Sequence, residues 1–246
     1  MLEKWIYKRS DKIIMTWAGG FEYICEKGWE QQIPAHKVAC ISNGVDLEEF
    51  VFNKENNVYS DPLMKDARKK FVYAGSIRRV NNLGLIVDAA RLINSKDVLF
   101  IIFGDGDERS LLEQQVQEFG LDNVVFKGKV EKKYIPSILN QSYCSILHNK
   151  STQLDKYGQS QNKFFEYLAA GKPILMTYSV GHSIVNKYEC GIELQEQTAY
   201  QIAEAVDNLS KMQDEAISFF NQHAYAVAKD YDFDVLTRKL IDIIEE

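Results

Sequence analysis

From about residue 70, short apolar runs alternate with longer amphipathic segments, and this alternation limits the possible folds more than any other feature of the sequence. Short apolar runs alternating with helical patterns are typical of βαβ units, in which helices cover both faces of a parallel sheet. The predicted strands are residues 70–75, 98–104, 123–128, 143–148, 172–177 and 190–194. We therefore expect an α/β fold with a Rossmann-like, doubly wound parallel sheet.

The two ends of the chain differ from this pattern. Residues 1–50 predict a helix, a short strand, a second helix and a strand that runs into the Asn43-Gly44 turn. We interpret them as the remnant of a preceding domain and a linker. Residues 51–225 contain the alternation and form the predicted Rossmann-like domain. Residues 226–246 predict a further amphipathic helix.

The composition argues against several functional classes. The formal net charge of −6 and the isoelectric point near 5.4 argue against a broad nucleic-acid footprint and leave a local basic pocket open. The four cysteines are scattered without a C-x-x-C pair, so neither a zinc site nor a disulfide framework is expected, and the reducing cytoplasm fits best. No apolar run approaches the roughly 18 residues of a membrane span. The motifs G-x-S-x-G, H-E-x-x-H and Walker A are absent.

The stretch SQNKFFEYLAAG predicts a helix over residues 160–170 that is apolar on nearly every side and therefore buried. Ser160 is the expected N-cap. The free amides of the first turn, the positive end of the helix dipole and the cation of Lys163 suit an anion such as a diphosphate. Glu166 lies one turn further in. Its carboxylate either accepts hydrogen bonds from two ribose hydroxyls or pairs with a neighbouring Lys or Arg and is structural.

Loops that follow the predicted strands lie at the carboxyl edge of the sheet, where ligands bind. Gly75 permits close approach to the backbone, and Arg78 and Arg79 either meet phosphate oxygens or form a solvated basic loop. Gly104 opens the stretch GDGDER, but Arg109 stands where a dinucleotide fingerprint needs its third glycine, so NAD binding is not expected. A third loop carries further candidate contacts, at His148, Lys150, Lys156 and Tyr157.

Five stretches, taken together in chain order, carry a family signature: VACISNGVDLEEF, FVYAGSI, LFIIFGDGDERSLLE, NVVFKGKV and YGQSQNKFFEYLAAGKPIL. With these stretches the chain resembles the group 1 glycosyltransferases, the large family 4 of retaining enzymes with the GT-B fold. The resemblance covers most of the chain and is closest to bacterial members that build surface polysaccharides. It implies that the sheet is the nucleotide-sugar-binding C-terminal domain of a GT-B fold. The N-terminal acceptor domain is then mostly missing, and the last helix is the one that crosses back to it.

The resemblance also implies roles for individual residues. Glu166 matches the glutamate that holds the ribose hydroxyls, and the amides of Gln161 and Asn162 match positions that face the diphosphate. Val130 matches the residue whose main chain contacts the base. Together with the loops above, the predicted donor-binding set is Gly75, Ser76, Arg78, Arg79, Gly104, Val130, Ser160, Gln161, Asn162, Lys163 and Glu166. No catalytic residue and no metal ligand is assigned.

Three departures from the family pattern stand out. Gly158 occupies the position of the first glutamate of the common motif, near the donor sugar. Asn81 and Asn82 occupy the stretch where a lysine is expected, so Lys163 and the two loop arginines are inferred as substitutes. Only the last pieces of an N-terminal domain are recognised. Whether the chain is a truncated piece, a gene fragment or one half of a split enzyme stays open.

The resemblance implies a metal-independent glycosyltransferase without a cofactor, which uses a UDP- or GDP-sugar as donor and a glycan or lipid-linked acceptor. The alternative is an inactive nucleotide-sugar-binding fragment or a subunit that depends on a partner chain. A sugar-nucleotide epimerase would need catalytic carboxylates and histidines that the chain does not assemble. A cytoplasmic location is expected, and peripheral association of the parent enzyme with the inner face of the plasma membrane stays open.

Overall fold

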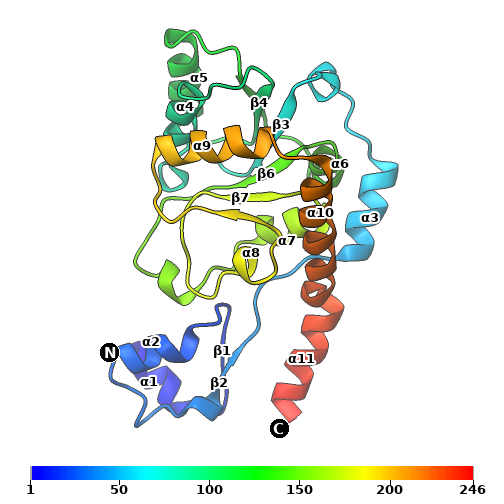
Figure 1. Cartoon of the computed structure of the whole chain (residues 1–246). Coiled ribbons are helices and arrows are strands. Elements are labelled where there is room, and N and C mark those ends of the chain that lie inside the picture. The colour runs from blue at the N-terminus through cyan, green and yellow to red at the C-terminus, as the bar shows by residue number, and fades with distance from the viewer. Residues whose placement is uncertain (1, 246) are drawn as a thin grey trace.

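The structure of the protein is a computed structural model that describes residues 2–245. The molecule is elongated, with a large α/β unit at one end and a small unit at the other (Figure 1). Both termini lie toward the small unit, because helix α11 (Phe233–Glu245) extends in that direction from the large unit. None of the helices between residues 2 and 245 is long and apolar enough to cross a membrane.

The large unit is built on a six-stranded sheet with the order β5-β4-β3-β6-β7-β8, in which each neighbouring pair is parallel. The strands are β3 (Lys69–Ala74), β4 (Val98–Phe103), β5 (Val124–Gly128), β6 (Cys144–Leu147), β7 (Ile174–Met176) and β8 (Gly191–Glu193). Each lies within a predicted apolar run or begins one residue before it, so the predicted doubly wound parallel sheet is confirmed. The winding direction reverses between β3 and β6, and ligands bind outside the carboxyl ends of strands at such a point.

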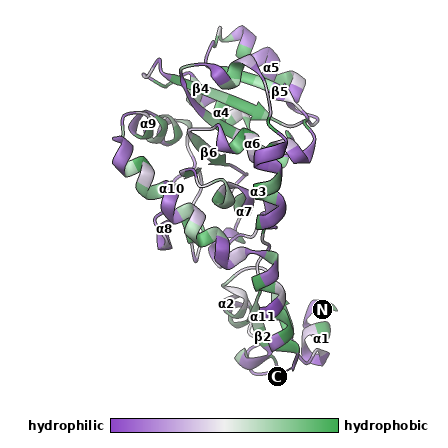
Figure 2. Ribbon diagram, turned by 90° about the vertical axis from the view of Figure 1, so that its right-hand side faces the viewer, coloured by the Kyte–Doolittle hydropathy of each residue, from purple (hydrophilic) through white to green (hydrophobic). Residues whose placement is uncertain are grey.

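Helices cover both faces of the sheet. One layer contains α4 (Gly84–Ala90), α5 (Arg109–Glu118) and α9 (Ala199–Ser210), and the other contains α3 (Leu47–Asn56), α6 (Ile135–Asn140), α7 (Asn162–Ala169) and α10 (Asp214–Ala228). Along β3, Phe71 and Tyr73 pack into the first layer, while Val72 and Ala74 pack into the second. The strands are hydrophobic and the surface helices are two-sided (Figure 2). Because helices cover both sides, β4 is buried along its whole length, as its unbroken apolar sequence predicts.

Two helices of the structure were not predicted. Helix α3 begins at an Asp46 N-cap, whose side chain accepts a hydrogen bond from the Glu49 amide at 2.8 Å, and it packs against α6. The Asp46-x-x-Glu49 spacing is the local signal of this helix start. Helix α8 (Ile184–Lys187) is a single turn capped by Ser183, too short for a periodic pattern. The predicted division of the chain at residues 50 and 225 stays a prediction.

The small unit has its own two-stranded parallel sheet and its own core. Its elements are α1 (Leu2–Arg9), β1 (Ile13–Met15), α2 (Gly20–Glu26) and β2 (Val38–Cys40), in the predicted order of helix, strand, helix and strand. Ile13, Met15, Ile24 and Ile33 form its buried cluster. The chain then runs through residues 41–46 to α3 on the large unit.

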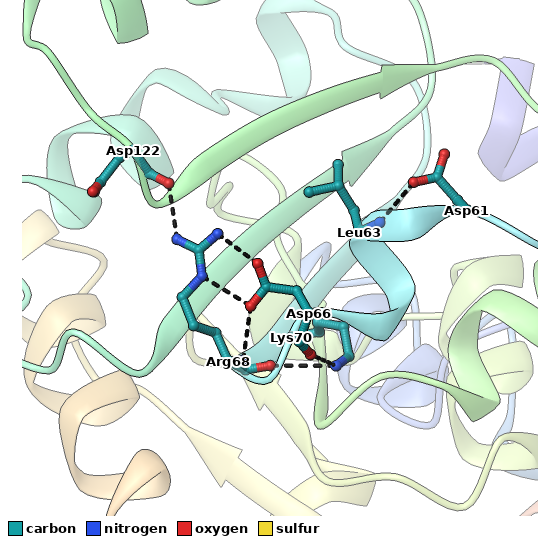
Figure 3. A network of polar contacts seen from close by, with 6 residues as sticks. All are labelled: Asp61, Leu63, Asp66, Arg68, Lys70 and Asp122. Carbon is teal, nitrogen blue, oxygen red and sulfur yellow. Dashed lines mark hydrogen bonds and ion pairs between the residues drawn. The ribbon is translucent and has the colours of Figure 1, made fainter.

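A polar network fixes the start of β3, at the edge of the sheet opposite to the ligand-binding edge (Figure 3). The Asp66 carboxylate accepts hydrogen bonds from the Arg68 guanidinium, which also donates to the Asp122 carbonyl at 2.9 Å. The bonds from Arg68 lower the pKa of Asp66 to about 2. Lys70 donates to the Asp66 carbonyl, and the Asp61 carboxylate accepts from the Leu63 amide. This network is structural, because it holds the segment that enters the central strand.

Candidate functional site

Two clefts lie side by side at the carboxyl edge of the sheet and along α7. The first has a volume of about 700 Å³ and is lined by Gly75, Ser76, Arg78, Phe103, Gly104, Asp105, Gly106, Lys129, Val130 and Ile135. The second, of about 220 Å³, is lined by residues of the linker, α3, α6, α7 and α11, Asn162 and Glu166 among them. Consecutive residues of α6, Ile135 and Pro136, line the first and the second cleft respectively, so the two clefts are neighbours.

The floor of the first cleft is backbone. Gly104 has a φ of +139°, and a Cβ atom there would lie 1.7 Å from the Gly75 carbonyl oxygen. The loops after β3 and β4 therefore meet only because residue 104 has no side chain. The Gly75 amide donates to the Phe103 carbonyl at 3.0 Å, and the Gly104 amide donates to the Gly128 carbonyl at 2.8 Å. Three neighbouring strand ends are joined in this way, with exposed backbone facing the cleft.

Gly104→Ala is expected to lower the free energy of unfolding by about 3–5 kcal/mol, because the new methyl group meets a fixed carbonyl oxygen and the backbone conformation is unfavourable for alanine. Urea unfolding measures the change. Gly120→Ala is the matched control, since Gly120 also has a positive φ, of +63°, but has nothing within 4 Å of the new Cβ. The control should lose only about 1–2 kcal/mol. Equal losses in both variants would contradict the close approach of the two loops.

Side-chain hydrogen bonds hold the loop after β3 in shape. The Ser76 hydroxyl donates to the Asn81 side-chain oxygen at 2.9 Å, and the Asn81 side-chain nitrogen donates to the Asn149 side-chain oxygen at 3.2 Å. Both arginines are exposed; Arg78 lines the first cleft, whereas Arg79 lines neither cleft. The role of Arg79 as a phosphate contact stays a prediction.

Lys163 is a half-buried lysine whose ammonium group is desolvated by the surrounding protein. Its Nζ donates to the His148 carbonyl at 3.1 Å and to the Tyr73 hydroxyl at 3.3 Å, and it lies 4.5 Å from the centre of the Tyr73 ring. No carboxylate within residues 2–245 forms an ion pair with it, and desolvation lowers its pKa to about 8. The Tyr73 hydroxyl in turn donates to the Ser76 carbonyl at 2.9 Å, so the ammonium lies beneath the loop that borders the first cleft.

Glu166 is a half-buried carboxylate that lines the second cleft. Within the described part of the chain it forms no hydrogen bond and no ion pair through its side chain. Burial raises its pKa, Lys132 opposes this shift, and Glu49 adds to it. Lys163 lies three residues earlier on the same helix, yet the two side chains do not pair. One turn of α7 thus carries a carboxylate without a hydrogen-bond partner and an ammonium without a carboxylate partner, and burying a charge in either state is costly.

The start of α7 differs from the expectation in one respect. The N-cap is Gln161 and not Ser160, because the Ser160 hydroxyl accepts a hydrogen bond from the Asn43 amide at 2.7 Å instead. The Gln161 amide donates to the Gln159 side chain at 3.1 Å, and its own side chain donates to the Tyr178 hydroxyl at 2.6 Å. Neither Ser160 nor Gln161 lines a cleft. The amides of Asn162 and of the residue after it find no acceptor within residues 2–245.

The candidate contacts in the loop before α7 lie elsewhere. His148 is buried, with Nδ1 at 2.5 Å from the Thr177 hydroxyl and Nε2 at 3.0 Å from the Asn82 carbonyl. Burial lowers the pKa of His148 to about 4, so it is a neutral core residue. Lys156 and Tyr157 both donate to Glu26 of the small unit. These residues therefore hold the loop and do not line either cleft.

The sequence did not predict several residues of the site, among them Asn43, Glu49, Tyr73 and Lys132. Tyr73 lies in a strand whose apolar sequence predicts a core position. No local signal shows that its hydroxyl accepts a hydrogen bond from Lys163, 90 residues later. Lys132 follows the carboxyl end of β5 in the stretch EKK, which is a usable signal for a cleft residue. The sequence predicts a turn at Asn43-Gly44 but gives no sign that Asn43 lines a cleft.

A doubly wound parallel sheet with glycine loops at its carboxyl edge defines the class of α/β domains that bind ligands at the point where the strand order reverses. Sequence comparison then identifies the family, because the model for "Glycosyl transferases group 1" matches residues 68–212, which is more than half of the chain. The chain belongs to the group 1 glycosyltransferases.

Individual relatives agree with this assignment. The chain is 25% identical over 154 residues to the "Putative colanic acid biosynthesis glycosyl transferase WcaI" of Escherichia coli (strain K12), which is 61% of this chain and 37% of WcaI. The Anabaena protein Alr3699/HepE, solved in complex with UDP and glucose, has a TM-score of 0.74 at 14% identity, over 99% of this chain and 66% of HepE. A glycosyltransferase of Rickettsia africae has a TM-score of 0.76 at 14% identity, over 98% of this chain and 65% of the Rickettsia chain. The chain thus spans little more than a third of WcaI and about two thirds of the two solved proteins.

Proposed function

We propose that this chain binds the nucleotide-diphosphate sugar that serves as donor of a glycosyltransferase. The observation that carries the proposal is the pair of unpaired charges on α7, the Lys163 ammonium and the Glu166 carboxylate. A nucleoside diphosphate supplies the matching groups, namely phosphate oxygens for the ammonium and two ribose hydroxyls for the carboxylate. NAD is disfavoured as a ligand because Arg109, which pairs with Glu113 at 2.8 Å, replaces the fingerprint glycine.

The two clefts accommodate different parts of such a ligand. The base would lie in the first cleft against Val130 and Ile135, and the ribose would face Glu166 in the second. The ribose connects the base to the diphosphate, which would lie beyond the ribose, near the Gly75–Ser76 backbone, Lys163 and the free amides of α7. In this arrangement each desolvated charge of the site acquires a partner from the ligand.

For the whole protein we propose glycosyl transfer with retention of anomeric configuration, in the synthesis of a polysaccharide or glycolipid. The bond between the anomeric carbon and the diphosphate oxygen breaks, a bond to an acceptor oxygen forms, and the proton of the acceptor hydroxyl passes to the departing diphosphate. Lys163 and the α7 amides would stabilise the charge on the departing diphosphate. The names of WcaI and HepE's bound UDP support this proposal. A lipid-linked acceptor would place the enzyme at a membrane surface.

The alternative is that this chain binds the donor without turnover, as a binding fragment or as a subunit that needs a partner. Transfer or hydrolysis of a UDP-sugar by the chain alone would exclude the alternative. Binding without turnover would support it.

Calorimetric titration of the chain with UDP, GDP and ADP tests the donor site. One of the three should bind with a Kd between about 1 μM and 1 mM, the range that a half-open site with several polar contacts supports. The preferred nucleotide identifies the base. A folded chain that binds none of the three would contradict the proposed function.

A further inference from the structure

The segment 157–161, which leads into α7, is held by parts of the chain more than a hundred residues earlier. The Gly19 amide of the small unit donates to the Tyr157 carbonyl at 2.8 Å. At the other end, the Asn43 amide donates to the Ser160 hydroxyl at 2.7 Å, and the Asn43 side chain donates to the Ser160 carbonyl. Both contacts precede Lys163 by only a few residues.

The contact at Tyr157 is closely packed. The Tyr157 hydroxyl donates to Glu26 at 2.7 Å, and its ring lies 5.7 Å from the Trp17 ring and 5.4 Å from the Tyr23 ring. A Cβ atom on Gly19 would lie 2.8 Å from the Tyr157 backbone, so the two backbones touch. This contact fixes the beginning of the segment against the small unit.

Asn43 is itself fixed from behind. A Cβ atom on the next residue, Gly44, would lie 2.3 Å from the Tyr231 carbonyl oxygen, which also accepts a hydrogen bond from the Val45 amide at 3.0 Å. The Phe233 amide donates back to the Val45 carbonyl at 3.0 Å. The linker therefore rests on the junction between α10 and α11, and Asn43 presents its donors to Ser160 from an anchored backbone.

Helix α7 depends on these bonds because its own N-cap contributes no side-chain hydrogen bond to the first turn. A helix start without such a cap frays easily. Two hydrogen bonds from Asn43 to the residue just before the cap supply the restraint that the cap lacks. Asn43 also lines the second cleft, together with Asn162 and Glu166, so it lies beside the residues that it orients.

We propose that Asn43 is a positioning residue, which fixes the first turn of α7 through Ser160 and thereby aims its free amides and Lys163 at the donor diphosphate. The inference rests on the proposed function, since it assigns the diphosphate to this turn. Through Asn43, the geometry of the site would depend on the linker, residues 41–46, and on the α10–α11 junction, both outside the loops at the sheet edge. Glu166 lies a turn further along α7, so the ribose contact should depend less on Asn43.

Two measurements on the full chain test this role. Asn43→Ala removes the side-chain donor, Ser160→Ala removes the hydroxyl acceptor, and Ser160→Thr keeps a hydroxyl. In the protein without nucleotide, hydrogen exchange of amides 161–164 should become at least about threefold faster in the two alanine variants and stay unchanged in Ser160→Thr. The affinity for UDP should fall about 3–10-fold in the alanine variants. The affinity for uridine, which has no diphosphate, should stay within about twofold.

Asn56→Ala is the matched control, because the Asn56 side chain makes a comparable bond to the Phe52 carbonyl on α3, away from α7. Unchanged exchange and unchanged UDP affinity in Asn43→Ala would overturn the inference, and so would equal losses for UDP and uridine. If Asn43→Ala does not fold, the Ser160→Ala and Ser160→Thr pair decides by the same readouts. If the wild-type chain binds none of UDP, GDP and ADP, the proposed function fails, and the exchange rates alone still show whether Asn43 fixes α7.

Discussion

Lys163→Met is expected to abolish the binding of nucleoside diphosphates while it makes the protein more stable. The variant keeps the apolar volume of the side chain and removes the only cation that contacts Tyr73 and the His148 carbonyl among residues 2–245. Loss of a buried contact to phosphate costs about 3–5 kcal/mol of binding free energy, which lowers the affinity for UDP by more than about 100-fold. The unliganded variant no longer carries a desolvated charge, so its free energy of unfolding at pH 7 should rise by about 1–3 kcal/mol. Calorimetry and urea unfolding measure the two effects.

The pH dependence of stability gives an independent signature of Lys163. Its pKa is about 8 in the folded protein and 10.5 as an ordinary lysine, so the unfolded chain binds more protons between these values. The stability contribution of this group therefore rises with pH from about 8 to 10.5, and Lys163→Met should lack this rise. Lys172→Met is the control, because burial also lowers the pKa of Lys172, at the opposite end of α7. It should leave UDP affinity unchanged. A Lys163→Met variant that is less stable and still binds UDP would contradict the assignment.

The sheet could be predicted from the sequence because its pattern is local. Strand β4 is covered on both faces, so its residues must be apolar without interruption, and an unbroken run such as VLFIIF is typical of a strand buried in this way. Helix α3 was not predicted although Asp46-x-x-Glu49 is a local signal for its start, and its position depends on packing against α6, more than 70 residues later in the sequence. For the small unit, the sequence predicts the order of helices and strands but not that they pack around a core of their own. Its contact with Tyr157 involves rings from segments that no local pattern connects.

The same division holds for the site. The sequence identifies Glu166 because a carboxylate in an apolar helix conflicts with burial, and Lys163 because a cation beside a helix N-terminus suits an anion. Their surroundings were not visible, since Tyr73 supports the lysine from a neighbouring strand and Lys132 faces the glutamate from another loop. The predicted N-cap was wrong for a related reason. Ser160 has a side chain that could cap the helix, but its hydroxyl accepts a hydrogen bond from the Asn43 amide of a distant segment instead.

Glu166→Gln is expected to weaken UDP binding by about 10–100-fold, the effect of losing hydrogen bonds from ribose hydroxyls to a charged acceptor. It should also remove discrimination between UDP and 2′-deoxy-UDP, because the carboxylate is the group proposed to bind the ribose hydroxyls. The unliganded protein should be no less stable at pH 7. Burial raises the pKa of Glu166, so its contribution to stability falls as pH rises through that pKa, and the neutral amide avoids this loss. Calorimetry with both nucleotides and urea unfolding at pH 5 and pH 7 measure these effects.

Glu204→Gln, on the exposed face of α9, is the matched control and should change neither affinity nor its ribose preference. The competing interpretation makes Glu166 a structural group that Lys132 stabilises at a distance. In that case Glu166→Gln would lower the stability at pH 7 and leave the preference for ribose intact. The two interpretations thus predict opposite signs for the change in stability. Because the structure shows no ion pair to Glu166 within residues 2–245, we expect the sign that belongs to a ligand-binding carboxylate.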